Sequence, residues 1–229
     1  MPPWLPMLGL FCCGAAAARS SFEARCEDSI GKTVTMLQAS QNGYTIDNTR
    51  SLRTLTSMKA PGLPNSFVLG LTRTESRVSV SLDGRILQER RAGVECVAPQ
   101  IRVSLFYAPI IVYIGKEFVP GSCAYKQILA HEMRHLKAYL DHLPKVESIV
   151  RAALAKRFEG RPLYAPIGMA QVRLEHEIDA SWMPYMKNQM GAVEAQQAAI
   201  DSPQEYARLS KVCKGEVQSL IGQARHGRR

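Results

Sequence analysis

The stretch "ILAHEMRHLKAYLDHL", residues 128 to 143, sets two histidines four residues apart within an apolar pattern of helical period. Residues four apart project from the same face of an α-helix, so His131 and His135 can offer imidazole nitrogens to one metal ion. Glu132 directly follows the first histidine and flanks the same side. The apolar residues that would bury this helix in a core are Ile128, Leu129 and Leu136. The stretch therefore predicts a buried helix that carries a metal site.

Upstream of this helix the sequence pattern predicts β-structure. The segment "RVSVSLDGRIL", residues 77 to 87, alternates polar and apolar residues, and its Asp83-Gly84 pair predicts a hairpin turn. Further strands are predicted in "KTVTMLQ" (32–38), "FVLGLT" (67–72), "IRVSLFY" (101–107) and "PIIVYIG" (109–115). Residues 26 to 120 are thus expected to form a β-rich lobe.

After Pro120 the apolar period becomes helical. Ser122 is a suitable N-cap for a helix over residues 123–143, and Pro144 would end that helix or start the next segment. Further helices are predicted at 145–158, from 169 onward with a kink or break at Pro184, and at 203–221. The fold class is therefore α+β: one domain of residues 19–229, with a helical lobe over 121–222 and a basic tail over 223–229.

The first 18 residues, "MPPWLPMLGLFCCGAAAA", carry no charged side chain and run from an apolar stretch into small residues. This pattern is typical of a secretory signal peptide, and cleavage is expected near Ala18, although the usual initial Lys or Arg is missing. No later stretch approaches the ~20 apolar residues of a membrane span. The mature chain is expected to be secreted or periplasmic, in a bacterial envelope.

Four cysteines remain after the predicted signal peptide, namely Cys26, Cys96, Cys123 and Cys213. An even number of cysteines in an exported chain predicts two disulfides. Three pairings are possible, and the sequence does not choose among them. A cysteine zinc site is not supported, because no two of these cysteines have CxxC spacing.

The charge balance favours some partners over others. Lys and Arg outnumber Asp and Glu by 29 to 20, and the basic residues are dispersed along the chain. This excess suits contact with an anionic envelope surface, and it is also explained by solubility alone. Aromatic residues make up 7% of the chain and are not interleaved with the basic clusters, so a nucleic-acid partner is not expected.

Two histidines do not complete a catalytic zinc site, which takes three protein ligands and a water. Asp141 fits the spacing HExxHxxGxxH/D, but Ala138 stands where that pattern has the glycine that turns the chain back. The helix should continue instead, which would place Asp141 about 15 Å along the axis from His131. Asp141 is therefore the weaker ligand candidate.

The preferred third ligand comes from "RLEHEIDASW", residues 173 to 182. Glu175 and Asp179 are one helical turn apart, so a crossing helix can aim Glu175 at the metal and Asp179 at the second nitrogen of a histidine. Glu177 is an alternative ligand, although a solvated position on the helix explains it as well. His176 is expected at the surface.

The combination of HExxH with a downstream ExxxD resembles the gluzincin arrangement of the zincin metallopeptidases. The "EHEID" segment is similar to the ExEAD segment of that group, with Ile178 where alanine is usual. The resemblance covers roughly residues 122–143 and 170–186. The resemblance implies that the zinc ligands are His131, His135 and Glu175. It also implies that Glu132 is the general base and that Asp179 is the hydrogen-bond partner of His131.

Zincins also place a β-strand along the substrate cleft, and "PIIVYIG" is the segment expected there; an interior core strand is the alternative. A downstream side chain usually stabilises the oxyanion. Tyr185 is the candidate for that role, with Tyr164 and Tyr206 equally available.

These observations predict a zinc-dependent endopeptidase with a polypeptide substrate. Zinc would acidify a bound water, and Glu132 would take its proton as the water attacks a polarised carbonyl. Two alternatives remain: a non-catalytic envelope protein with a structural or vestigial zinc site, and a basic module that binds anionic envelope polymers.

Overall fold

The computed structural model describes residues 21–59, 67–160 and 162–226. The predicted signal peptide and residues 227–229 of the predicted tail lie outside them. The predicted α+β class is confirmed, with mixed sheets in the N-terminal half and helices in the C-terminal half. Residues 223–226, predicted as the start of the tail, continue the last helix, α8 (Glu216–His226).

The larger sheet has the strand order β1-β5-β4, with β7 pairing alongside β5. β1 runs parallel to β5, whereas β4 and β7 are antiparallel to it. Along β5, the buried residues Ile101, Val103 and Leu105 alternate with the exposed Arg102, so one face of the sheet packs on helices. The strands are β1 (Val34–Gln41), β4 (Ser76–Glu89), β5 (Val94–Tyr107) and β7 (Leu163–Pro166).

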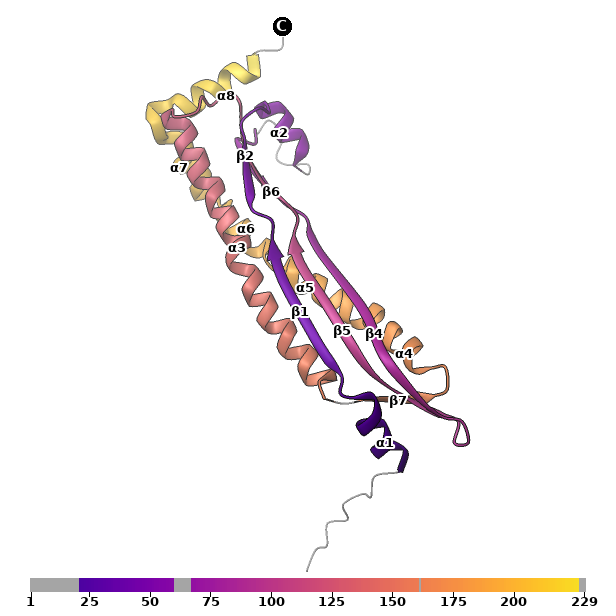
Figure 1. Cartoon of the computed structure of the whole chain (residues 1–229). Helices are drawn as coiled ribbons and strands as arrows, with labels where there is room; N and C mark the ends of the chain where they lie inside the picture. The colour runs from indigo at the N-terminus through magenta and orange to yellow at the C-terminus, as the bar shows by residue number, and fades with distance from the viewer. Residues whose placement is uncertain (1–20, 60–66, 161, 227–229) are drawn as a thin grey trace, which may run out of the picture.

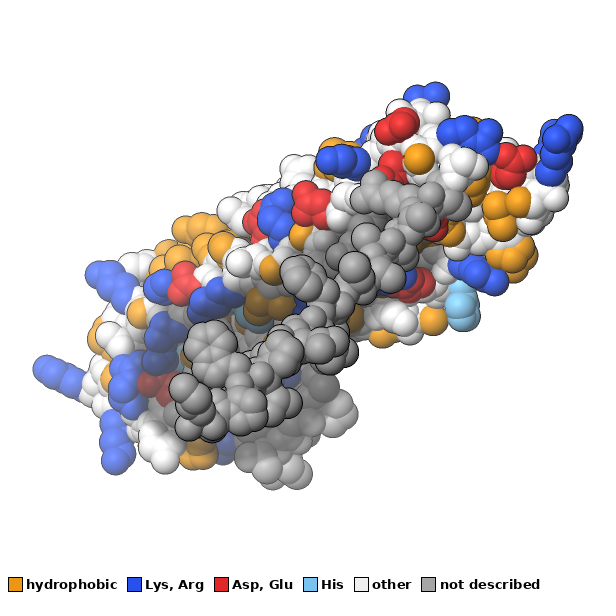
Figure 2. Space-filling view, turned by 90° about the horizontal axis from the view of Figure 1, so that it is seen from below, with side chains coloured by type: hydrophobic (Ala, Val, Ile, Leu, Met, Phe, Trp, Pro, Cys, Tyr) orange, Lys and Arg blue, Asp and Glu red, His pale blue; other side chains and the backbone are white. Residues whose placement is uncertain are grey.

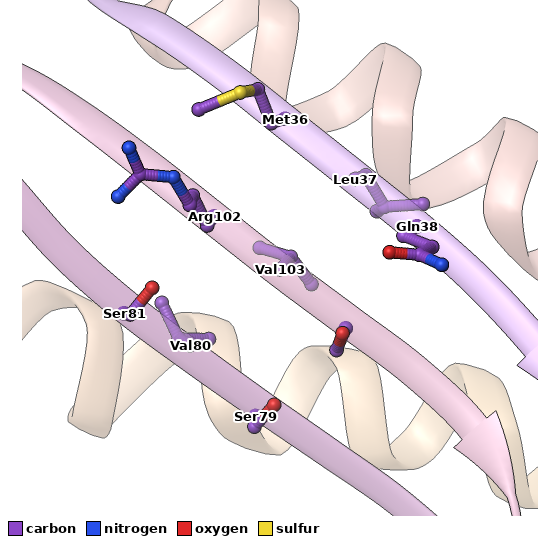
Figure 3. A pocket seen from close by; sticks show the side chains of 9 residues that line it. Met36, Leu37, Gln38, Ser79, Val80, Ser81, Arg102 and Val103 are labelled. Atoms are coloured by element: carbon purple, nitrogen blue, oxygen red, sulfur yellow. The ribbon is translucent and has the colours of Figure 1, made fainter.

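The other face of the larger sheet is open to solvent. Exposed side chains of β1, β4 and β5, among them Met36, Ser81 and Arg102, line a shallow hollow of about 420 Å³ (Figure 3). An antiparallel pair with one solvated face explains the alternating pattern that predicted these strands.

The hairpin turn predicted at Asp83-Gly84 is wrong. β4 continues through both residues, and the turn to β5 lies at residues 90–93. A Cβ at Gly84 would lie 2.9 Å from the carbonyl oxygen of Ala98 on β5. This glycine is therefore required by the close approach of the neighbouring backbone and does not form a turn.

The smaller sheet has the order β2-β6-β3, with β2 (Tyr44–Asp47) parallel and β3 (Gly70–Arg73) antiparallel to β6 (Ile110–Ile114). The expectation that "PIIVYIG" lies along the cleft is wrong, because β6 is the central strand. Its Ile110, Val112 and Ile114 are fully buried. An almost wholly apolar run is typical of a strand that is covered on both faces.

A single long helix, α3 (Cys123–Phe158, 36 residues), carries the two histidines and runs along most of the molecule (Figure 1). Its predicted N-cap is confirmed, since the Ser122 hydroxyl accepts a hydrogen bond from the amide of Tyr125 at 3.1 Å. Pro144 lies inside this helix and does not end it. The apolar period continues through the buried Leu143, Val146 and Val150, whose packing outweighs the lost hydrogen bond.

The helices after β7 follow one another from the larger sheet past the middle of α3 to its N-terminal end (Figure 1). Those nearest the larger sheet are α4 (Ala170–Glu177), a π-helical turn (Ile178–Trp182) and α5 (Met183–Gly191), and α5 packs against β4. α6 packs against α3. The predicted helix 203–221 is broken by Cys213 and Lys214, which both have positive φ. The remaining elements are α6 (Glu194–Ile200), α7 (Pro203–Lys211) and a 3₁₀ turn, η2 (Val212–Gly215).

Two short helices in the N-terminal half pack against strands that follow them in the chain. α1 (Ser21–Ile30) packs against β4 and β5. α2 (Leu52–Met58) packs against β3, and its first amide donates to the Glu117 carboxylate at 3.0 Å. The hydroxyl of Ser51 caps the same helix end through the amide of Thr54. α2 ends at Lys59, beside the smaller sheet.

The predicted pair of disulfides is present, and the structure selects one of the three pairings. Cys26–Cys96 ties α1 to β5, and Cys123–Cys213 ties the start of α3 to η2. In the described part of the chain, no helix combines the length and the apolar character needed to cross a membrane. On the face seen in Figure 2, the Lys and Arg side chains of the described residues lie among acidic and apolar ones.

Candidate metal centre

Three side chains converge on one point beside α3. The Nε2 atoms of His131 and His135 lie 3.2 Å apart, and Oδ1 of Asp201 lies 3.2 Å from each of them. Asp201 is at the junction of α6 and α7. A tetrahedral zinc ion with bonds of about 2.0–2.1 Å has ligand atoms about 3.3 Å apart. The three atoms therefore have the spacing that one zinc ion needs, and three protein ligands leave a fourth position for water.

The other ring nitrogen of His131 is held by a carboxylate. Its Nδ1 lies 3.2 Å from Oε1 of Glu205, which also binds Arg134 and Arg208. Arg134 is 2.9 Å from the same Nδ1, but both are donors that share Oε1 of Glu205 as their acceptor. With the proton on Nδ1, the lone pair of Nε2 is free for a metal.

Two arginines keep Glu205 ionised. The hydrogen bond from Arg208 is the largest cause, and it lowers the pKa of Glu205 to about 2 against the effect of burial. A carboxylate that is charged at neutral pH stabilises the Nδ1–H tautomer of His131 and makes its Nε2 a stronger ligand.

His135 is oriented in the same way by an amide. Its Nδ1 donates to Oε1 of Gln197 on α6, while Nε2 of Gln197 donates to the backbone oxygen of His135 at 3.2 Å. The second bond fixes which end of the amide faces the ring. Both histidines therefore present Nε2 toward Asp201.

Glu132 lies next to this group without belonging to it. Its Oε1 is 3.9 Å from Nε2 of His131, and its Oε2 accepts a hydrogen bond from the Thr72 hydroxyl on β3 at 2.9 Å. A Cβ at Gly70 would lie only 2.6 Å from Oε1, so glycine at this position makes room for the carboxylate. Burial raises the pKa of Glu132 more than the two histidines and Thr72 lower it. This carboxylate suits a proton acceptor beside the metal position.

The strand beside Glu132 is β3, which is an edge of the smaller sheet. Among the described residues it pairs only with β6. No described strand pairs with its second edge, and an edge of this kind is where another extended chain can add.

The structure does not bring the sequence-predicted third ligand to the histidines. Glu175 is on α4, accepts a hydrogen bond from Gln171 at 2.8 Å, and lines with Asp179 a hollow next to β4. The group of possible ligands around the histidines contains Asp201 in its place. Asp179 likewise does not contact His131, whose partner is Glu205. α4 packs against β5 and β7 of the larger sheet, which keeps both residues away from the centre.

The weaker ligand candidates are engaged elsewhere. Asp141 is exposed and accepts from Lys137 at 2.6 Å, as the uninterrupted helix requires. Glu177 forms an ion pair with Arg157 and accepts from the Trp182 indole, and its side chain remains 29% exposed on the helix surface. His176 is exposed, as expected.

The tyrosines proposed for the oxyanion lie in different places. Tyr185 packs edge-on against Trp182, and Tyr164 packs edge-on against Phe22. Tyr206 interacts with Asp201. Of the three, Tyr206 is the one beside the candidate centre.

Sequence reasoning missed the residues of α6 and α7 that complete the site. Gln197, Asp201 and Glu205 follow one another at intervals of four, and Ser202 caps α7 by accepting from the amide of Glu205 at 3.2 Å. That polar series in an Ala-rich stretch, with the Ser-Pro helix start at residues 202–203, is the signal that could have identified them.

A second group of potential ligand atoms does not form a metal site. Cys123, Cys213 and Glu216 lie close together, but the two sulfurs are bonded to each other and offer no thiolate.

Comparison of the chain with protein-family models, with curated proteins and with solved structures finds no match in any of the three. The functional argument therefore depends on the geometry of the centre.

Proposed function

We propose that the chain is a zinc-dependent peptidase whose metal ligands are His131, His135 and Asp201. The observation that carries this proposal is the triangle of ligand atoms with 3.2 Å sides, beside a buried carboxylate that is not part of it. A structural zinc site normally has four protein ligands, whereas a hydrolytic site has three and an adjacent base.

Each residue of the proposed site has a separate role in peptide hydrolysis. Zinc, when bound, would lower the pKa of a water and polarise a substrate carbonyl. Glu132 accepts the proton of that water and delivers it to the nitrogen of the departing amine. Burial favours this role, because a poorly solvated carboxylate holds a proton more readily than an exposed one. Thr72 and Gly70 fix the position of the carboxylate.

The edge of β3 that pairs with no described strand supports a polypeptide as the substrate. An extended peptide that added to this edge would run past Thr72 and so past Glu132. The resemblance to zincins at HExxH points to the same reaction. The two disulfides support an oxidising compartment, and we therefore place the enzyme outside the cytoplasm, secreted or in the periplasm.

The test compares the two candidate third ligands. Asp201→Ala should lose zinc and casein hydrolysis together, because two remaining ligands rarely retain a catalytic metal. Glu175→Ala is the matched control and should keep both. Zinc content by metal analysis and casein cleavage are measured on the purified parent and both variants.

Two results would contradict the proposal. A parent chain that stays metal-free after incubation with zinc would remove the site and favour a basic binding module. A parent that holds one zinc ion but cleaves nothing in a broad panel of unfolded proteins would favour a structural zinc site.

A further inference from the structure

The two oxygens of Asp201 have different partners. Oδ1 lies 3.2 Å from the histidine nitrogens, while Oδ2 lies 3.0 Å from the ammonium nitrogen of Lys59. Lys59 is the C-cap of α2 and comes from a part of the chain 142 residues away from Asp201. Tyr206 lies close enough to interact with both Asp201 and Lys59. The outer oxygen is thus already engaged by an ammonium group that is not a metal ligand.

This arrangement matters because a carboxylate can bind a metal through one oxygen or through both. Two-oxygen binding by Asp201 would place a fifth ligand atom against the water position of a catalytic site and make the metal five-coordinate. An ammonium on Oδ2 favours one-oxygen binding, since the metal would have to displace a charge-assisted hydrogen bond to gain the second oxygen.

We propose that Lys59 is a positioning residue that keeps Asp201 bound to the metal through Oδ1 alone and thereby keeps the fourth metal position open. This inference rests on the proposed metal centre but does not require that the centre be a peptidase. Lys59 would act through Asp201 without touching the substrate.

The surroundings of Lys59 distinguish it from an ordinary surface ion pair. In the exposed Lys137–Asp141 pair the side chains are 73% and 51% exposed, whereas those of Lys59 and Asp201 are 43% and 26% exposed. The Lys59 ammonium also acts on the charge of Glu132. Lys59 thus contacts one carboxylate of the metal position and is near enough to a second to interact with its charge.

The experiment uses Co²⁺ in place of zinc, because the visible absorption of Co²⁺ reports its coordination number. Four-coordinate Co²⁺ absorbs several-fold more strongly than five-coordinate Co²⁺. Lys59→Met removes the ammonium and keeps the aliphatic stem, Lys59→Arg keeps the charge, and Lys137→Met removes an ammonium of the exposed pair on α3. Circular dichroism confirms that each variant is folded.

The parent, Lys59→Arg and Lys137→Met should show the strong four-coordinate spectrum. Lys59→Met should bind one equivalent of Co²⁺ with a several-fold weaker spectrum, because Asp201 closes on the metal with both oxygens. A Lys59→Met spectrum equal to that of the parent would overturn the proposal, and so would a parent that binds no Co²⁺. A parent with the strong spectrum but without peptidase activity would overturn only the proposed function.

Discussion

The two most deeply buried glutamates of the described residues have surroundings that give them opposite protonation behaviour. Glu95 on β5 is 1% exposed, and Glu132 on α3 is 3% exposed. Burial raises the pKa of both, but hydrogen bonds from the backbone around Ala170 and from Gln88 hold the pKa of Glu95 below its usual value. Glu132 has the hydroxyl of Thr72 as a donor, and its pKa stays raised.

The difference shows that the donors around a buried carboxylate decide its role. Glu95 receives the first amide of α4 at 2.8 Å and so caps a helix whose own N-cap, Met169, supplies no side-chain hydrogen bond. Its negative charge is stabilised and serves the fold. The charge of Glu132 is less well satisfied, so this carboxylate remains ready to take a proton.

The largest effect is expected from removing the charge of Glu132. Glu132→Gln should lower peptidase turnover by ~10²–10⁴, the usual value of general-base assistance, while zinc content stays unchanged. Glu95→Gln is the control and should leave the turnover of the folded fraction unchanged. Casein hydrolysis and metal analysis measure both. A Glu132→Gln variant as active as the parent would remove the distinction between the two glutamates.

The next effect concerns the two disulfides, one on the strand that carries Glu95 and one at the start of the helix that carries Glu132. They join residues 90 and 70 positions apart, so removal of either should cost a similar ~2–5 kcal/mol of stability. Cys123→Ser with Cys213→Ser should also weaken zinc binding, because Cys213 anchors the end of α7, which carries Glu205.

Cys26→Ser with Cys96→Ser should leave zinc affinity unchanged in the folded protein. Competition with a chelator measures the affinity, and urea denaturation measures the stability. Equal zinc affinities for the two double variants would show that the Cys123–Cys213 bond does not support the centre.

A smaller effect is expected on the pH dependence of stability. Glu95→Gln should lower the free energy of unfolding by about 1–3 kcal/mol at pH 7, because a charged acceptor at a helix start is lost. The pKa of Glu95 is lower in the folded chain than in the unfolded one. Its contribution is therefore present above the unfolded pKa of ~4.3 and is lost as the pH falls through the folded pKa.

Urea denaturation of the parent and Glu95→Gln across pH 3–7 tests this. The stability difference between the two should shrink toward the acidic end. A difference that is constant with pH would mean that packing, and not the charge of Glu95, supplies the stability.

The smallest effect is expected at Thr72. Thr72→Val keeps the shape of the side chain but removes the donor to Glu132, and a single hydrogen bond is worth about 0.5–1.5 kcal/mol. Turnover should fall by about tenfold or less, with zinc content unchanged. Gln88→Leu removes one of several donors to Glu95 and should leave turnover unchanged. A Thr72→Val variant that loses zinc would assign Thr72 to the metal ligands instead of the base.

How much of the site could be predicted from the sequence depends on how far apart its residues lie along the chain. His131, Glu132 and His135 share one helix, so their relative positions depend on helix geometry alone and could be derived from spacing. The third ligand depends on which later helix crosses α3. ExxxD favoured Glu175 by its pattern, but α4 packs against the larger sheet, and α6 brings Asp201 to the histidines instead.

In the fold, too, features set by neighbouring residues were predictable from the sequence and features set by distant residues were not. Periodicity predicted β-structure at β1, β4 and β5 and the start of α3 at Ser122, because these depend on neighbouring residues, but it did not predict β7. The pairing partners of β6 and the continuation of α3 through Pro144 depend on packing by distant residues, which the local pattern does not contain.

The position of Asp201 in the chain also sets the order in which the centre can assemble. Asp201 follows His135 by 66 residues, so the two histidines can take up their helix long before the third ligand reaches them. Tight zinc binding must await the docking of α6 and α7 on α3. A zinc ion would then bind the completed fold in preference to partly folded chains, and it would stabilise that fold by an amount that grows with the logarithm of its free concentration over its Kd. Zinc binding would therefore be one of the last steps of folding.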